Sequence, residues 1–233
     1  MKIFTFGIAR VPVSRTLSAF MRPPNCANVP GLVHAEFLTL MRLGAPIASL
    51  DRMQLRNLTM FAAWESEDAI EEFLSKSPLG QAMATGWHLR MSFLRRWGSV
   101  RQFSSLPEDT GECDPLAPVA AYTLARMKLP EVPRFIKWGR PVEELVRDHP
   151  ETTMALAAIR YPRSVATFSI WNSQQAMTDM VRGHNQMERP DRHMAAMKER
   201  SRRDFHSEFT TLRFRPISEH GSWKGCSKFV KDH

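Results

Sequence analysis

Two mostly apolar stretches, one in each half of the chain, resemble each other closely. Residues 3–10 read IFTFGIAR and residues 119–126 read VAAYTLAR, and both end in Ala-Arg. A proline-containing segment with an amphipathic helical pattern follows each stretch. Alternation with period two is typical of a half-buried strand, and apolar spacings of three and four are typical of a helix. The pattern therefore predicts the same strand and helix twice.

A longer pair of matching segments follows in each half. Residues 56–74 read RNLTMFAAWESEDAIEEFL, and residues 163–181 read RSVATFSIWNSQQAMTDMV. In both, a strand pattern with Phe three residues before Trp runs into a polar turn and then a helical pattern. The residues that can cap these helices are Ser66 in the first segment and Asn172 or Ser173 in the second. The repeat thus extends over a second strand and a second helix.

Each half closes with a further helical pattern and a last strand, at residues 93–103 and 207–217. The predicted order in each half is strand, helix, strand, strand, helix, helix, strand. Two strand–helix–strand blocks per unit are typical of a ferredoxin-like module. We predict an α+β fold in which tandem ferredoxin-like repeats form a dimeric α+β barrel-type architecture within one chain.

The domain organisation follows from the repeat. We assign residues 1–103 to the first repeat, 119–217 to the second, and 218–233 to a C-terminal tail that wraps the surface. Residues 104–118, SSLPEDTGECDPLAP, are polar with three prolines and one glycine, which is typical of a linker. The first half is longer than the second between equivalent positions, and we place the insertion at residues 41–51.

Two such sheets can pack face to face, with helices on their outer faces. A ligand is expected in the volume between the sheets. The alternative is that large side chains fill this volume, since the chain contains 14 Phe, 14 Met and 6 Trp residues. Trp64 and Trp171 occupy equivalent positions in the repeat, and they are interpreted either as walls of the pocket or as core anchors.

The charge of the chain narrows the set of partners. There are 32 basic and 24 acidic residues, a net charge of +8, which suits nucleic acid, an anionic membrane surface or an anionic cofactor. No zinc-finger spacing or RNA-binding aromatic signature is present, so we do not expect nucleic acid as a partner. No apolar run reaches the roughly 18 residues of a membrane-spanning helix. Three widely spaced cysteines and the absence of a signal-peptide pattern favour a cytoplasmic protein.

Common catalytic motifs are absent, and their absence directs attention to histidines. The sequence has no GxSxG, GxGxxG, P-loop or HExxH motif. His193 follows Pro190 near the start of a helical pattern and shares a face with Met197, four residues on. We expect this face to point to the interior, where a neutral imidazole can bind iron. The alternative is a partly buried histidine that is hydrogen-bonded to a backbone carbonyl.

Other polar residues of the second half offer weaker sites. His184 and His193 with Glu188 or Asp191 could form a site of two histidines and one carboxylate for iron, although Pro190 interrupts the spacing. The neighbouring His206 adjoins the last strand and is expected to be exposed.

Two arginines of the last strand are candidate cofactor ligands. Arg213 and Arg215 alternate with Phe214, so they share one face of the strand. A guanidinium group binds carboxylates in a bidentate manner, so these arginines could pair with the carboxylates of a bound cofactor. The alternative is that both are ordinary surface residues.

Several segments of the chain resemble the spheroidene monooxygenase family, the acyclic-carotenoid 2-ketolases. The segments that carry the resemblance are VAAYTLARMKLPEVPRFIKW, ATFSIWNSQQAM, RHMAAMKERSRRDFHSEFTTLRFRPI and GSWKG in the second half, with VPGLVHAEFLTLM and MFAAWES in the first. The resemblance is more specific after residue 118. The insertion at 41–51 and the loop PPNCANVP at 23–30 depart from the family pattern.

This resemblance implies a haem-dependent oxygenase that inserts oxygen at an unactivated carbon of a carotenoid. The fold would be similar to the α+β barrels that hold haem in chlorite dismutases. His193 matches the histidine on the helix before the last strand and is assigned the axial role on iron. The resemblance carries over this role alone. From the residue patterns described above, we expect Arg213 and Arg215 to hold the haem propionates, and Trp64, Trp171 and Met197 to line the pocket.

The leading hypothesis is therefore a cytoplasmic haem monooxygenase that takes a lipophilic substrate, O₂ and an electron donor. The basic surface is expected to approach the periphery of an anionic membrane, where such a substrate dissolves. Two other functions are compatible with the same residues. One is a protein that binds haem or a small lipophile without catalysis, and the other is a monooxygenase that needs no cofactor. The sequence fixes neither the substrate nor the oligomeric state.

Overall fold

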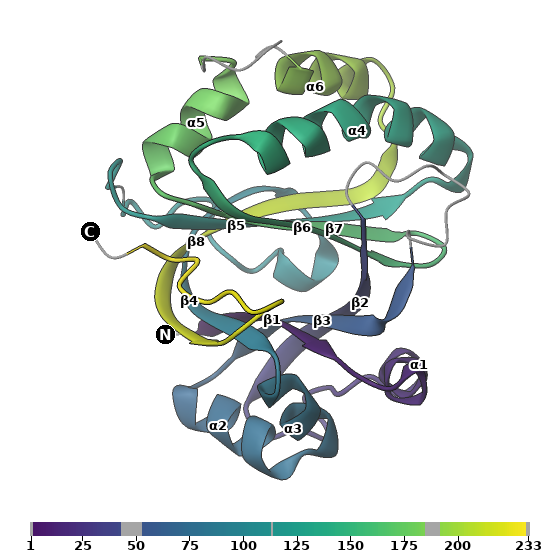
Figure 1. The fold of residues 1–233 in the computed structure, drawn as a ribbon. Coiled ribbons are helices and arrows are strands. Elements are labelled where there is room, and N and C mark those ends of the chain that lie inside the picture. Colours follow the sequence, from purple (N-terminus) through teal and green to yellow (C-terminus); the bar gives the residue numbers. More distant parts are fainter. Residues whose placement is uncertain (1, 43–52, 113, 185–191, 232–233) are drawn as a thin grey trace.

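Eight strands in the described part of the chain close into one antiparallel barrel, in the order β1-β3-β2-β6-β7-β5-β8-β4 (Figure 1). The coordinates are those of a computed structural model, which describes residues 2–42, 53–112, 114–184 and 192–231. The first four strands are β1 (Ile3–Arg10), β2 (Leu32–Met41), β3 (Gln54–Trp64) and β4 (Trp87–Ser99). The last four are β5 (Val119–Met127), β6 (Thr152–Arg160), β7 (Ser164–Trp171) and β8 (His206–Gly221).

The predicted repeat is visible in this strand order. The first half contributes the neighbours β2-β3-β1-β4, and the second half contributes β6-β7-β5-β8 in the same relative order. The halves join where β2 pairs with β6 and where β4 pairs with β8. The predicted fold class, a tandem ferredoxin-like α+β repeat that forms a barrel, is therefore confirmed.

Helices cover the outside of the barrel in two separate layers (Figure 1). The first half carries α1 (Val13–Met21), α2 (Glu67–Lys76) and α3 (Pro78–Ala84), and the second carries α4 (Val132–Asp148), α5 (Gln174–Arg182) and α6 (Arg192–Arg202). The predicted caps form at equivalent positions, because the Ser66 and Ser173 side chains accept hydrogen bonds from the Ala69 and Ala176 backbone amides. No helix among the described residues has the length and apolar character needed to cross a membrane.

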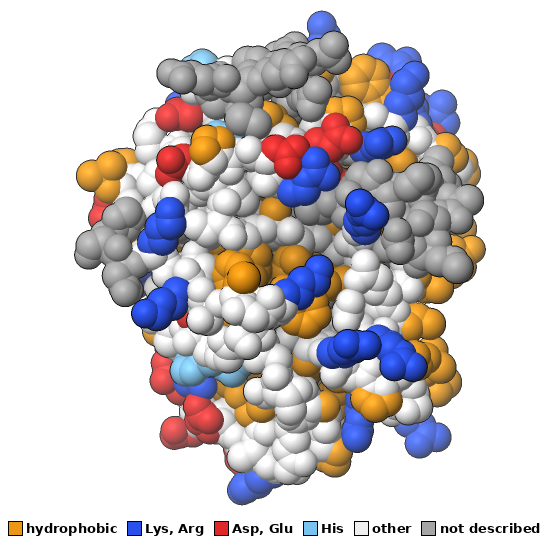
Figure 2. Space-filling view, viewed as in Figure 1, with side chains coloured by type: hydrophobic (Ala, Val, Ile, Leu, Met, Phe, Trp, Pro, Cys, Tyr) orange, Lys and Arg blue, Asp and Glu red, His pale blue; other side chains and the backbone are white. Residues whose placement is uncertain are grey.

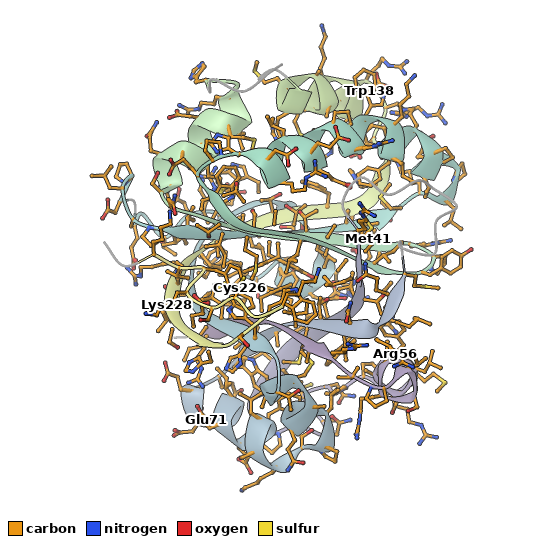
Figure 3. The ribbon with its side chains drawn as sticks, viewed as in Figure 1. Met41, Arg56, Glu71, Trp138, Cys226 and Lys228 are labelled. Atoms are coloured by element: carbon orange, nitrogen blue, oxygen red, sulfur yellow. The ribbon has the colours of Figure 1, made fainter. Side chains whose placement is uncertain are left out.

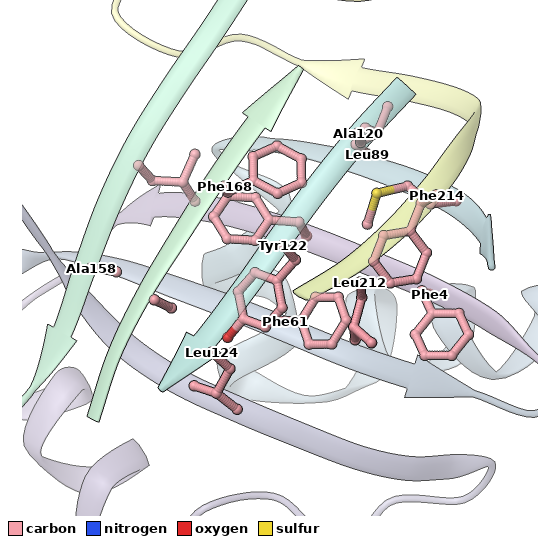
Figure 4. Close-up of a cluster of buried hydrophobic side chains, with 14 of the residues drawn as sticks. Phe4, Phe61, Leu89, Ala120, Tyr122, Leu124, Ala158, Phe168, Leu212 and Phe214 are labelled. Carbon is pink, nitrogen blue, oxygen red and sulfur yellow. The ribbon is translucent and has the colours of Figure 1, made fainter. Parts of the chain in front are cut away.

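Aromatic side chains fill the interior of the barrel (Figure 4). Phe6 of the first half stacks on Phe168 of the second, with ring centroids 3.9 Å apart and planes 4° apart. Phe61 stacks on Tyr122 in the same way, at 3.9 Å and 13°. Stacked pairs of this kind bury a large apolar area and favour one arrangement of the two sheets. The expectation of a ligand between the sheets is therefore wrong, and the alternative of a filled interior is what the structure shows.

Segments outside the strands close both ends of this core. At one end Trp223 and Phe229 of the C-terminal tail pack against the core, and Glu219 accepts hydrogen bonds from the Trp87 indole at 2.7 Å and the Phe229 amide at 3.0 Å. At the other end the 3₁₀ turn Arg101–Phe103 inserts Phe103, which packs edge-on against Phe61. The tail is thus part of the core rather than only a surface wrap. Most of the predicted insertion at 41–51 lies outside the described residues.

One charged cluster joins the two halves inside the barrel. Glu36 of β2 and Arg126 of β5 lie 2.5 Å apart, His34 bonds to the same Glu36 oxygen at 3.0 Å, and Arg126 also donates to Ser164. Burial alone would raise the pKa of Glu36, but the hydrogen bonds and charges of His34 and Arg126 outweigh burial and hold this pKa below its ordinary value. The carboxylate is therefore ionised in the folded protein and stabilises it above the pKa of the unfolded chain.

We expect Glu36→Gln to lower the free energy of unfolding at pH 7 by about 3 kcal/mol, because Arg126 loses its partner in a buried site. The difference from the parent protein should shrink as pH falls through the folded pKa of Glu36, since protonation removes the same interaction. A series of urea denaturation experiments between pH 3 and pH 7 measures both effects.

Glu72→Gln is the matched control. Glu72 pairs with Lys76 on an exposed surface, and loss of this pair should lower the free energy of unfolding by less than about 0.5 kcal/mol. Equal losses for both variants would contradict the prediction.

Candidate functional site

The outer faces of the two sheets differ at equivalent positions of the repeat. Alignment of the matching segments pairs Gly7 with Thr123 and Met60 with Thr167. In the first half Met60 is buried, and the end of Met83 lies 3.4 Å from the place that a Cβ on Gly7 would take. In the second half both threonines remain half-exposed, although they lie at the centre of a sheet that helices cover. The second half thus lacks the side chains that fill this layer in the first.

We call Thr123, Thr167 and Thr211 the threonine floor. The hydroxyls of Thr123 and Thr211 lie 3.0 Å apart on adjacent strands, and Thr167 pairs with Thr123 in the sheet. All three side chains are half-exposed. Between sheet and helices, the first half has one continuous apolar cluster, whereas the second half has two separate ones, around Trp171 and around Phe205. Along β5, Thr123 of the threonine floor lies between Ala121 of the first of these clusters and Ala125 of the second.

His193 lies in the helix layer on this side of the barrel. Its helix α6 packs on α4 and α5, and its imidazole hydrogen-bonds to the backbone carbonyl of Val181 in α5. Burial lowers the pKa of His193 below its ordinary value, so the ring is neutral near pH 7. A neutral ring that donates one N–H to a carbonyl presents a lone pair on its other nitrogen, the arrangement common in metal-binding histidines. The expectation that this ring enters the barrel interior is wrong, since α6 lies outside the barrel.

Arg213 and Arg215 share a strand face as predicted, but their surroundings differ. Arg213 is buried, donates to the Thr178 hydroxyl of α5 at 3.3 Å, and lies with its guanidinium 4.5 Å from the ring centre of Trp97. Arg215 is exposed and pairs with Glu112 at 2.7 Å. It lines a surface pocket of ≈ 330 Å³ beside the start of α5. His193 and Arg213 therefore both contact helix α5, whereas Arg215 lies at the surface.

The remaining predicted pocket residues do not share one wall. Trp64 and Trp171 are fully buried on the outer faces of different sheets, where their indoles donate to Thr5 and Ser169 at 2.9 Å. They anchor the two helix layers, so they correspond to the core anchors that the sequence offered as an alternative. Met197 is half-buried on α6, one turn from His193.

Sequence reasoning placed His206 at the surface, and the structure buries it. Its Nδ1 lies 3.0 Å from the Asp204 carboxylate, its Nε2 is buried without a described partner, and the rings of Phe135 and Phe209 pack around it. Burial lowers the pKa of His206 to about 4, helped by the charge of Arg200 and opposed by Asp204. The ring is thus neutral, and a donor bond from Nδ1 to Asp204 leaves a lone pair on Nε2. The sequence offered one indication that His206 has a partner, namely Asp204, two positions before it.

The predicted site of two histidines and one carboxylate finds no support in the described residues. His184 is exposed, and both carboxylates considered for this site, Glu188 and Asp191, lie outside the described residues. Within the described part of the chain, no group of three or more His, Cys, Asp or Glu side chains is placed to hold a metal ion.

Comparison with known proteins agrees with the sequence resemblance. No family model matches the chain. The chain is 28% identical over 169 residues to a curated protein named spheroidene monooxygenase from Rubrivivax gelatinosus, and the match covers 71% of this chain and 62% of that protein. The chain thus spans less than two thirds of the length of this relative.

A solved structure has a similar fold. An aldoxime dehydratase solved with butyraldoxime superposes with a TM-score of 0.53 at 7% identity, covering 98% of this chain and 83% of the other. A monooxygenase-like protein from Listeria innocua matches with a TM-score of 0.31 at 10% identity, over 94% of this chain and 95% of the other. At 7% identity the similarity to the aldoxime dehydratase speaks for the fold alone. The chain is therefore a tandem ferredoxin-like barrel whose sequence is similar to spheroidene monooxygenase.

Proposed function

We propose that the protein is a haem-dependent monooxygenase that oxygenates an unactivated carbon of a lipophilic, carotenoid-like substrate. The observation that carries the proposal is the half-exposed threonine floor on the outer face of the second sheet, on the side that the helix layer with His193 covers. The similarity to spheroidene monooxygenase supports the reaction class. In this proposal the cofactor lies between the second sheet and its helices, rather than between the two sheets.

The residues present fit a haem in donor chemistry. His193 is neutral, has one nitrogen engaged by the Val181 carbonyl, and would offer the other to iron. Arg213 contacts the same helix and would pair with a propionate. Haem, when bound, supplies the oxidant for an alkyl carbon, which no protein side chain can supply.

The protein's own groups would contribute binding, orientation and exclusion of water. The hydroxyls of the threonine floor are hydrogen-bond donors and acceptors in an otherwise apolar layer. The apolar clusters on either side, around Trp171 and Phe205, would exclude water from the reacting carbon.

The test is titration of the purified protein with haem, followed by assays with an acyclic carotenoid, a reductant and O₂. We expect a Soret band that saturates at one haem per chain and an oxygenated product that depends on haem. Haem binding without product would favour the binding protein without catalysis. Oxygenation by haem-free protein would favour the monooxygenase without cofactor and overturn the proposal.

A filling substitution tests the position of the site. Thr167→Met places in the second half the residue that fills the first half at the equivalent position, Met60. We expect the melting temperature to stay the same or rise, since filled gaps commonly add roughly 0.5–2 kcal/mol, and we expect haem affinity to fall roughly tenfold, a loss of about 1.4 kcal/mol. Met60→Leu is the control, because it conserves volume in a layer that is already filled. Unchanged haem affinity in Thr167→Met would place the cofactor elsewhere.

A further inference from the structure

Helix α1 presents an apolar face to solvent. Leu17 and Met21 are four residues apart, so they lie on the same side of the helix, and Met21 is 76% exposed. Arg15 lies within the helix and Arg22 directly follows it. An amphipathic helix with exposed apolar residues and flanking arginines is typical of segments that lie in a membrane interface.

Two other segments extend this surface. The Thr16 hydroxyl donates to the Leu55 carbonyl at 2.7 Å, which holds α1 against the start of β3. Arg160, before the β6–β7 turn, donates to the Phe20 carbonyl at 2.7 Å and lies over the Phe20 ring. Next to these contacts Met53 is exposed, and Tyr161 is 75% exposed. Residues 13–22, 53–57 and 160–163 therefore form one surface, which we call the α1 face.

The charge of the α1 face has one sign. It carries five arginines and no acidic residue: Arg15, Arg22, Arg56, Arg160 and Arg163. The first acidic residue of the whole sequence is Glu36. Figure 2 shows blue and orange side chains without red over the lower right of the molecule, where Figure 1 places α1, and Figure 3 shows Arg56 beside this helix.

Arginines of the second helix layer are arranged differently. Arg134 and Arg203 pair with Glu131, and Arg202 pairs with Glu199. By contrast, no described acidic residue forms an ion pair with Arg15, Arg22, Arg56 or Arg163 on the α1 face. A fixed positive charge without internal partners is available to an external anion.

We propose that the α1 face docks on the surface of an anionic lipid bilayer. Exposed Leu, Met and Tyr side chains favour the boundary between headgroups and acyl chains, and each arginine near an anionic surface adds attraction. Nucleic acid would use the arginines but not Leu17, Met21 and Met53. This inference is independent of the proposed haem chemistry, since it concerns a different part of the molecule.

The experiment is co-sedimentation of the full chain with phosphatidylglycerol–phosphatidylcholine vesicles, compared with phosphatidylcholine vesicles and with duplex DNA. We expect binding to the anionic vesicles that weakens with salt. Leu17→Ser with Met21→Ser should weaken this binding roughly tenfold, and Arg15→Gln with Arg22→Gln should weaken it roughly thirtyfold, at about tenfold for each 1.4 kcal/mol.

Matched controls are exposed apolar residues outside the α1 face. Leu116, in the linker, is 72% exposed, and Met194 is exposed on α6. Leu116→Ser with Met194→Ser should leave vesicle binding within twofold of the parent protein, and thermal melting verifies that all variants are folded. The proposal is overturned by absent binding to anionic vesicles, by equal losses in the control, or by loss of DNA binding as the only effect of the arginine variant.

Discussion

His193→Ala is expected to abolish the Soret band at haem concentrations that saturate the parent protein, with at least a hundredfold loss of affinity. The proposed iron ligand is the only group on α6 that combines a neutral ring with a carbonyl hydrogen bond among the described residues. Mutation of residues that support metal ligands typically lowers metal affinity tenfold to hundredfold. We expect a larger loss of affinity when the iron-binding nitrogen itself is removed. Absorption spectroscopy during haem titration measures the loss, and electron paramagnetic resonance of the ferric protein reports the change of axial ligand.

The control for this prediction is His206→Ala. His206 is also neutral and buried, but its ring packs against the Phe135 and Phe209 rings. We expect this variant to keep the Soret maximum of the parent protein. If His206→Ala loses the band and His193→Ala keeps it, the axial ligand is His206, and Asp204→Asn should then shift the band by releasing Nδ1. If both variants keep it, the haem proposal loses its protein ligand.

Phe168→Ala is expected to lower the free energy of unfolding by about 4 kcal/mol. Its ring is fully buried, stacks on Phe6 and packs near Trp87, so truncation leaves a large cavity at the contact between the two halves. Because the interior is shared by both sheets, the loss should appear in one cooperative transition. Urea denaturation followed by tryptophan fluorescence and by circular dichroism measures the loss and tests whether the two signals coincide.

Tyr161→Ala is the control for this substitution. It removes an aromatic side chain that is mostly exposed, and it should change stability by less than about 0.5 kcal/mol. A loss below about 1 kcal/mol for Phe168→Ala would mean that the interior is loosely packed. The space between the sheets would then again be a candidate ligand site.

The order of the elements was predictable because the same pattern occurs twice in the sequence. One copy of FTFGIAR or FSIW is ambiguous, but two copies with the same turn and cap residues indicate a repeated module. The direction in which each strand face points was less accessible. Strands such as VAAYTLAR are apolar on both faces, since one face meets the other sheet and the other meets helices. Phe168 and Trp171 are three positions apart, so alternation alone places them on opposite faces, but only closure of the barrel decides which of the two faces is the inner one.

The candidate site was predictable in its residues but not in its location. The pairing of His193 with a helix face required only a spacing of four, which the sequence supplies. Its position outside the barrel depends on how α6 packs on α4 and α5, and this packing involves contacts between segments far apart in sequence. The burial of His206 and the ionised Glu36 likewise depend on partners from other elements, apart from the nearby Asp204 and His34.

The unequal packing of the two helix layers has a consequence for how such a molecule can evolve. In a homodimer of single modules, every substitution appears twice, so a methionine that fills the layer between sheet and helices in one copy fills it in both. Joining both modules in one polypeptide lets them diverge. Buried Met60 and Met83 pack the outer face of the first half, whereas half-exposed threonines occupy the corresponding face of the second. A covalent duplication of this kind allows a binding site to be kept in one half of the barrel and lost in the other.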